Sequence, residues 1–253
     1  MAPSDAVRLP SLERLQSLMS PQGIRPFRVG IVIGPGFVPM DMVGVHTVLG
    51  LMPGAQILLL WKSRDLVEGL SSWWTQPTTT FAECPAELDV IAVPMLPPEI
   101  QNDPEVIDFV GQHARQARYV IGICNGVLLL GASGLLKGKR VTASYNALAL
   151  LPELGAREVV SAAGGVVRDG NLFTAGPSVG SFEAALLVAE SAFGREAAEL
   201  AEWIIQYDPH PPFGVGAVER APTQYKARFA ALMSDMVAHY RSGSVGAFRK
   251  AVS

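Results

Sequence analysis

One stretch constrains this chain more than any other, because a strand pattern changes directly into a helix pattern within it. Residues 119–123, Tyr-Val-Ile-Gly-Ile, are mostly β-branched and aromatic types that favour a buried strand. Residues 127–133 are good helix formers, and only Cys-Asn-Gly at 124–126 separates the two runs. Such a junction predicts a sharp turn from strand to helix with Cys124 at its apex. Gly126 then removes the Cβ atom that would crowd this turn.

Cys124 itself has two interpretations. The amides of the helix that follows would point at its sulfur, and the helix macrodipole would favour the thiolate, which is the reactive form. The alternative is a buried cysteine that packs as a small hydrophobic residue, as most free cysteines do. The setting between a strand and a helix favours the reactive interpretation, a nucleophile elbow.

The composition limits what the chain can be. Of its 253 residues, 49% are hydrophobic and only 17% are charged, which supplies enough apolar material for a sizeable core. A formal net charge of -3 leaves no basic surface for nucleic acid. The two cysteines, Cys84 and Cys124, are too few for a disulfide framework and have no Cys-x-x-Cys spacing. The small number of cysteines favours a reducing compartment, and the missing Cys-x-x-Cys spacing argues against a metal site.

No segment predicts a membrane or secretory protein. No apolar run approaches the roughly 18 residues that a spanning helix needs. The first residues carry Asp5 and Glu13 and lack the apolar core of a signal peptide. We therefore expect a cytoplasmic protein that has no membrane partner.

Strand and helix patterns alternate along the chain. Apolar runs predict strands at residues 27–33, 56–61, 88–93 and 119–123. Periodic runs predict helices at residues 42–51, 105–118, 127–133, 146–154, 181–193 and 195–207. A β-hairpin is expected at 166–174, with Asp169-Gly170 as its turn signal, and the turn-rich residues 62–87 suggest another. This alternation predicts an α/β fold with a mostly parallel sheet and helices on both faces.

We interpret residues 1–253 as one domain, because no repeat or low-complexity linker interrupts them. Residues 1–26 form an N-terminal arm in which leucines recur every third residue, at Leu9, Leu12, Leu15 and Leu18. This spacing predicts a helix with one buried face, packed either on its own domain or on a second subunit. Residues 217–253 form a C-terminal tail whose pattern from Pro222 to Phe248 is helical and comparatively polar.

The predicted strands also indicate where a site would lie. Ligands of such sheets gather at the carboxyl ends of the strands. Asp41, Met95, Leu96 and Cys124 all follow strands closely, so the same edge of the sheet brings them together. Asp41 has an alternative role as the N-cap of the helix expected from Met42, which is a common position for aspartate.

Several ordered stretches resemble the ThiJ/PfpI superfamily, which has the fold of class I glutamine amidotransferases, and within it the isonitrile hydratases. The resemblance covers about residues 27–216. It is carried by residues 34–44, 124–126 with the following helix, 134–142, 166–171 and 206–213. The last two stretches are the most specific, because generic members of the superfamily lack the Tyr-Asp-Pro and Pro-Pro-Phe run at 207–213.

This resemblance implies a flavodoxin-like homodimer that uses no cofactor and no metal. It also implies that Cys124 attacks the terminal carbon of a small apolar isonitrile while Asp41, beside the sulfur, manages protons. Water then resolves a thioimidate, and the product is an N-substituted formamide. The residues suit this chemistry, because a soft nucleophile adds to an isonitrile most readily when an acid stands beside it. Asp41 is such an acid if an apolar pocket keeps it protonated.

The remaining site residues would support this chemistry. Backbone amides at Asn125 and around Met95 and Leu96 are expected to hold negative charge, and Gly36 and Gly126 belong to the same pocket. The side chain of Asn125 would place the water, although asparagine is also an ordinary turn residue.

The sequence departs from its relatives at three of these places. Asn125 replaces the usual threonine, Met95-Leu96 replaces a common glycine pair, and Ser144-Tyr145 replaces a common His-Trp pair. The last change removes the histidine of a Cys–His dyad, which argues against a triad amidase. Two alternatives stay open: another cysteine-dependent activity of the superfamily, such as a glyoxalase or small-amide hydrolase, and a non-enzymatic redox or ligand sensor.

Overall fold

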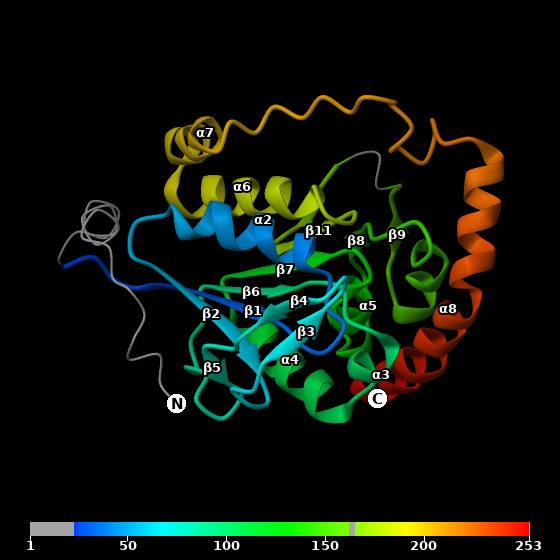
Figure 1. Ribbon diagram of the computed structural model, residues 1–253. Coiled ribbons are helices and arrows are strands. Elements are labelled where there is room, and N and C mark those ends of the chain that lie inside the picture. The colour runs from blue at the N-terminus through cyan, green and yellow to red at the C-terminus, as the bar shows by residue number, and fades with distance from the viewer. Residues whose placement is uncertain (1–22, 162–164, 253) are drawn as a thin grey trace.

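The centre of the computed structural model, which describes residues 23–161 and 165–252, is a seven-stranded sheet (Figure 1). Its strands are β1 (Phe27–Val32), β2 (Ala55–Trp61), β5 (Thr79–Thr80), β6 (Val90–Val93), β7 (Tyr119–Ile123), β10 (Val167–Asp169) and β11 (Leu172–Ala175). They lie in the order β10–β11–β7–β6–β1–β2–β5, and every pairing is parallel except that of β10 with β11. The N-terminal arm predicted for residues 1–26 has its leucine-spaced part outside the described residues.

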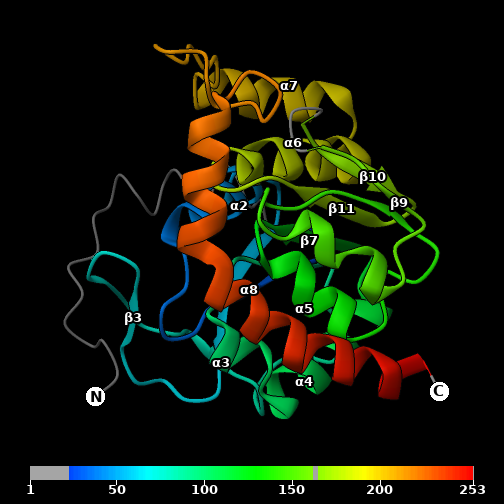
Figure 2. The same cartoon turned by 90° about the vertical axis from the view of Figure 1, so that its right-hand side faces the viewer.

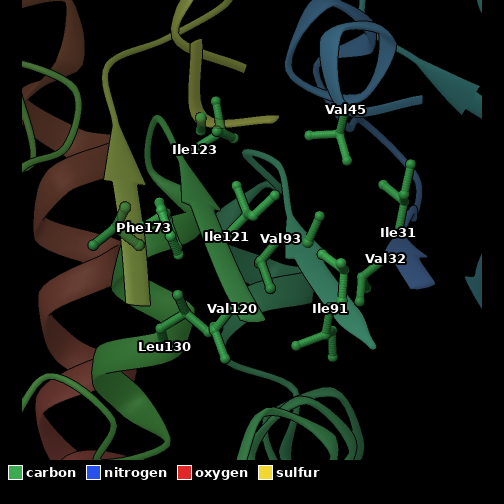
Figure 3. Close-up of a cluster of buried hydrophobic side chains, with 14 of the residues drawn as sticks. Ile31, Val32, Val45, Ile91, Val93, Val120, Ile121, Ile123, Leu130 and Phe173 are labelled. Atoms are coloured by element: carbon green, nitrogen blue, oxygen red, sulfur yellow. The ribbon is translucent and has the colours of Figure 1, made fainter. Parts of the chain in front are cut away.

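The three central strands, β1, β6 and β7, are buried on both faces of the sheet. Successive side chains of a strand point to opposite faces, so strands covered on both sides need apolar residues at almost every position. Figure 3 shows Ile31, Ile91 and Ile121 among the side chains that fill these two layers. Full burial of each contributes roughly 1.5–3 kcal/mol. The strands predicted from continuous apolar runs are therefore confirmed.

Helices cover the two faces of the sheet in separate groups (Figure 1). On one face α2 (Pro39–Gly50) packs beside α6 (Gly180–Phe193), and α7 (Arg195–Ile204) packs on α6. The other face carries α3 (Pro98–Gln101), α4 (Pro104–Gln116), α5 (Gly126–Ala132) and α8 (Thr223–Val252). The expectation of a flavodoxin-like α/β fold, with a mostly parallel sheet between helical layers, is confirmed.

The C-terminal helix α8 crosses the outer side of α5 and α3 (Figure 2). Its contact with the loop after α3 is close, because a Cβ atom on Gly243 would collide with the side chain of Asn102. The Asn102 amide also donates a hydrogen bond to the carbonyl oxygen of His239, at 3.0 Å. The helix predicted for the tail is therefore present, and it is docked on the domain.

One predicted helix is wrong. Residues 146–154 form two short 3-10 turns, η1 (Leu148–Leu150) and η2 (Pro152–Leu154), in place of one α-helix. Pro152 explains the difference, because it lacks the N–H that a continuous helix would need at that point. Gly155 ends the segment as expected, with a left-handed φ of 83°.

Two small sheets lie beside the main sheet in the described part of the chain. A hairpin is present in residues 62–87, but it consists of β3 (Val67–Gly69) and β4 (Trp73–Thr75), paired antiparallel, whereas the expected strand at residues 78–81 joins β2 in the main sheet as β5. The strands β8 (Arg140–Val141) and β9 (Glu158–Val159) pair in parallel beside the main sheet. Within residues 23–161 and 165–252, no helix has both the length and the apolar character needed to cross a bilayer.

Candidate active site

Cys124 occupies a strained turn between β7 and α5. Its φ is +57°, in the left-handed region that non-glycine residues enter at a cost of about 1–3 kcal/mol and that is concentrated at functional sites. Its amide donates to the carbonyl oxygen of Ala175, at 3.1 Å, which ties the turn to the end of β11. A Cβ atom on Gly126 would lie 2.5 Å from the carbonyl oxygen of Pro94, so this position requires glycine. The predicted sharp turn is therefore present.

The sulfur of Cys124 is buried among polar groups. The residue is 8% exposed, and its side chain is hydrogen-bonded to Asp41 and lies beside the hydroxyl of Ser144. Burial, and then the charge of Asp41, raise the pKa of the thiol far above its ordinary value, while the Asn125 amide opposes the shift. The amide at the start of the helix does favour the thiolate, as expected, but burial and Asp41 outweigh it. A macrodipole contributes about 0.3–1 kcal/mol near a helix end, less than the desolvation of a buried charge.

Asp41 projects from the first turn of α2 and is 1% exposed. Its Oδ1 accepts from the amide of Ser178, at 2.7 Å, and its Oδ2 accepts from the amide of Met95, at 3.0 Å. Burial raises the pKa of Asp41 to about 6, although these two amides and the Cys124 thiol favour the carboxylate. The proposed N-cap role is wrong, because α2 begins at Pro39 and the preceding residue makes no side-chain cap.

Segments that follow three parallel strands thus bring the Asp41 carboxylate and the Cys124 thiol together. Asp41 follows β1, Met95 follows β6, and Cys124 follows β7. Ser178 follows β11, and its backbone amide donates a hydrogen bond to Asp41. The convergence expected at the carboxyl ends of the strands is confirmed, and a proton has a direct path between sulfur and carboxylate.

Met95 and Leu96 differ from the expectation of free amides that hold negative charge. The Met95 amide is already donated to Asp41, so it holds the carboxylate in place. The carbonyl oxygen of Leu96 accepts from the side chains of Gln101, at 3.0 Å, and of Tyr240. Gly36 also has a structural role, because its amide donates to Glu68 and its φ is +78°.

Asn125 is held at its backbone. It is 1% exposed, and its carbonyl oxygen accepts from the side-chain amide of Gln101, at 3.0 Å. Its side-chain Oδ1 has no hydrogen-bond partner among the described residues. A buried acceptor without a partner is uncommon in proteins and marks a place where water or substrate would bind.

Three residues near the cysteine were not predicted. Ser144 donates to Oδ1 of Asn146, at 2.6 Å, and lies against the sulfur of Cys124. Ser178 adopts a positive φ of 58°, for which the local sequence carries no signal. Tyr240 comes from α8 and touches the site only through the tertiary fold.

Two cavities have neighbours of these residues in their linings. One of about 630 Å³ is formed by the start of α6 and the segment from Tyr207 to Arg220, and residues on both sides of Ser178 line it. Another, of about 350 Å³, separates the segment around Asn146 from α8. Cys124 itself lines neither cavity.

The comparisons with known proteins agree with this geometry. An isonitrile hydratase from Pseudomonas putida is 42% identical over 201 residues, which are 78% of this chain and 85% of that protein. A ThiJ/PfpI family protein from Pseudomonas syringae superposes with a TM-score of 0.82 at 27% identity, over 96% of this chain and 98% of that one. A DJ-1 superfamily protein from Salmonella typhimurium gives a TM-score of 0.63 at 25% identity, over 72% and 99%. The model of the DJ-1/PfpI family matches residues 27–191, and the chain therefore belongs to the DJ-1/PfpI family, as the resemblance predicted.

Proposed function

We propose that this protein hydrates isonitriles to N-substituted formamides, with Cys124 as the nucleophile and Asp41 as the proton carrier. The observation that carries the proposal is the buried contact between a thiol and a carboxylate whose pKa is about 6. The 42% identity to the isonitrile hydratase of Pseudomonas putida supports the choice of substrate. The substrate is a small apolar isonitrile, and neither a metal nor a cofactor takes part.

The first half-reaction forms a thioimidate. The Asp41 carboxylate takes the thiol proton as the sulfur of Cys124 bonds to the terminal carbon of the isonitrile. The attack turns the carbon–nitrogen triple bond into a double bond, and the lone pair left on carbon takes the proton from Asp41. Because the proton moves with the attack, the reaction needs no free thiolate in the resting site. The raised pKa of Cys124 is therefore compatible with its role.

The second half-reaction consumes water. Asp41 accepts a proton from the water as the water oxygen bonds to the thioimidate carbon, and the imine nitrogen receives a proton from Asp41. The tetrahedral intermediate then collapses: the carbon–sulfur bond breaks and its electron pair returns to sulfur. The hydroxyl proton passes through Asp41 to Cys124, which restores the thiol. One isonitrile and one water give one formamide, and an acid with a pKa of about 6 is suited to both directions of proton transfer.

The site is less suited to the alternatives. A triad amidase needs a histidine beside the thiol, and Ser144 stands at that place. A redox sensor needs an accessible thiol with a low pKa, whereas Cys124 is buried and its pKa is raised. A glyoxalase activity would use the same two residues, so the experiment has to separate it from isonitrile hydration.

The test measures products from purified protein given cyclohexyl isonitrile or, separately, methylglyoxal. We expect N-cyclohexylformamide from wild type and from Cys84→Ser, which alters the half-buried second cysteine, and none from Cys124→Ala. Rapid quenching and mass spectrometry should find one isonitrile on Cys124. Absence of formamide from wild type, or full activity of Cys124→Ala, would end the proposal. Faster lactate formation from methylglyoxal would favour the glyoxalase.

A further inference from the structure

Helix α8 places a tyrosine inside the domain. Tyr240 is 0% exposed and is the largest fully buried side chain of the described residues. Most of α8 is exposed, and Tyr240 and Ser244 are its buried residues. A phenol hydroxyl that is buried this deeply must find hydrogen-bond partners.

The partners of Tyr240 belong to the candidate active site. Its hydroxyl donates to the carbonyl oxygen of Leu96, and the side-chain amide of Asn125 hydrogen-bonds to the same hydroxyl. Burial raises the pKa of Tyr240, although the hydrogen bond with Asn125 opposes the shift, so the phenol stays neutral and remains a donor. Tyr240 therefore contacts Asn125, the residue next to the cysteine.

Gln101 completes this arrangement. Its Nε2 donates both to the carbonyl oxygen of Leu96 and to that of Asn125, each at 3.0 Å. Asn125 is thus fixed at its backbone by Gln101 and at its side-chain nitrogen by Tyr240. The orientation leaves Oδ1 of Asn125 buried, with no partner among the described residues.

We propose that Tyr240 is a positioning residue for the hydrolytic half-reaction. By holding the side-chain nitrogen of Asn125, it aims Oδ1 so that this oxygen accepts one hydrogen of the attacking water. The water donates its other proton to Asp41 as its oxygen bonds to the thioimidate carbon. This inference rests on the proposed function. It gives Asn125 and Tyr240 a role in the second half-reaction only, because the first half-reaction involves no water.

The experiment compares Tyr240→Phe with Tyr225→Phe, a control on the same helix whose tyrosine is 52% exposed. Phenylalanine keeps the packing and removes only the hydroxyl. We expect kcat of Tyr240→Phe to fall about 5- to 10-fold, as for loss of one neutral hydrogen bond. The rate of adduct formation on Cys124 should stay unchanged, so the thioimidate should accumulate in rapid-quench mass spectra. Tyr225→Phe should match wild type.

A double-mutant cycle with Asn125→Ala separates positioning from a structural role. If Tyr240 acts through Asn125, adding Tyr240→Phe to Asn125→Ala should lower kcat no further. Additive losses, or slower adduct formation without accumulation, would overturn the inference, as would unchanged turnover of Tyr240→Phe. Melting temperatures of all variants show whether a loss of activity is due to unfolding. Failure of wild type to form any adduct or formamide would instead overturn the proposed function.

Discussion

At the scale of single residues, the main feature is the carboxyl group of Asp41, which is buried and still accepts several hydrogen bonds. Two amides and a thiol point at Asp41, yet burial outweighs them and its pKa rises to about 6. The amides fix both oxygens, so the group changes its protonation without changing its position. Such a pKa near the working pH is what a residue needs to accept and return protons.

The pH dependence of turnover follows from this pKa. In the proposed first step the ionised Asp41 accepts the thiol proton, so kcat/KM should rise as pH increases through about 6 and then level off. Steady-state rates between about pH 5 and about pH 8 measure this. Asp41→Asn, which cannot accept the proton, should lose nearly all activity across the whole range. A flat profile in wild type would contradict the assignment of Asp41.

Gly126 provides a second prediction at this scale. In Gly126→Ala the new Cβ would meet the carbonyl oxygens of Val93 and Pro94, and backbone atoms cannot move aside as a flexible side chain does. We expect a loss of about 3 kcal/mol in the free energy of unfolding. Gly50→Ala is the control, because its Cβ would make only an ordinary contact, 3.9 Å from Ile57. Equal denaturant midpoints for the two variants would be inconsistent with a crowded turn.

At the scale of elements, α8 is the unexpected contributor. Its pattern predicts a helix but not its position, because its buried residues contact segments far away in sequence: Tyr240 and Leu96 are 144 positions apart. Local patterns do predict β7, the turn at Cys124 and the strand ends that assemble Asp41, Met95 and Cys124. Local patterns do not predict residues that reach the site only through tertiary contacts, such as Ser178. They also do not predict the raised pKa of Cys124, because that pKa depends on burial in the folded domain.

Two glycines of α8 test how the helix is docked. Gly243→Ala should lower the free energy of unfolding by about 1–3 kcal/mol, because the new methyl group must displace Asn102 and its bond to His239. Gly246→Ala has open space around it and should instead raise stability by roughly 0.5–1 kcal/mol through helix propensity. Urea denaturation of both variants measures the difference, and the opposite order of stabilities would show that α8 docks elsewhere.

At the scale of the whole molecule, the homodimer implied by the family resemblance stays a prediction. The outer face of α7 presents Leu200, Trp203 and Ile204, which are 56%, 74% and 51% exposed and lie three and four residues apart on one side of the helix. An exposed apolar patch of this kind on a folded domain is typical of a protein–protein contact. We expect a second copy of the chain to cover it.

Replacement of Trp203 tests this face. Trp203→Asp would place a charge within the expected interface, so sedimentation should change from dimer to monomer. Leu232→Asp, at a position on α8 that is 78% exposed, is the control and should leave the mass unchanged. A monomeric wild type would contradict the dimer, and a dimeric Trp203→Asp would place its interface elsewhere.

The position of α8 in the chain has a consequence for synthesis. Ribosomes deliver the sheet, the thiol and the carboxyl group well before residues 223–252 emerge. A nascent chain would therefore already contain the nucleophile while still lacking the phenol that contacts Leu96 and Asn125. Because that phenol is proposed to orient the side chain of Asn125 toward the attacking water, an incomplete chain should hydrolyse the thioimidate more slowly than the finished protein does.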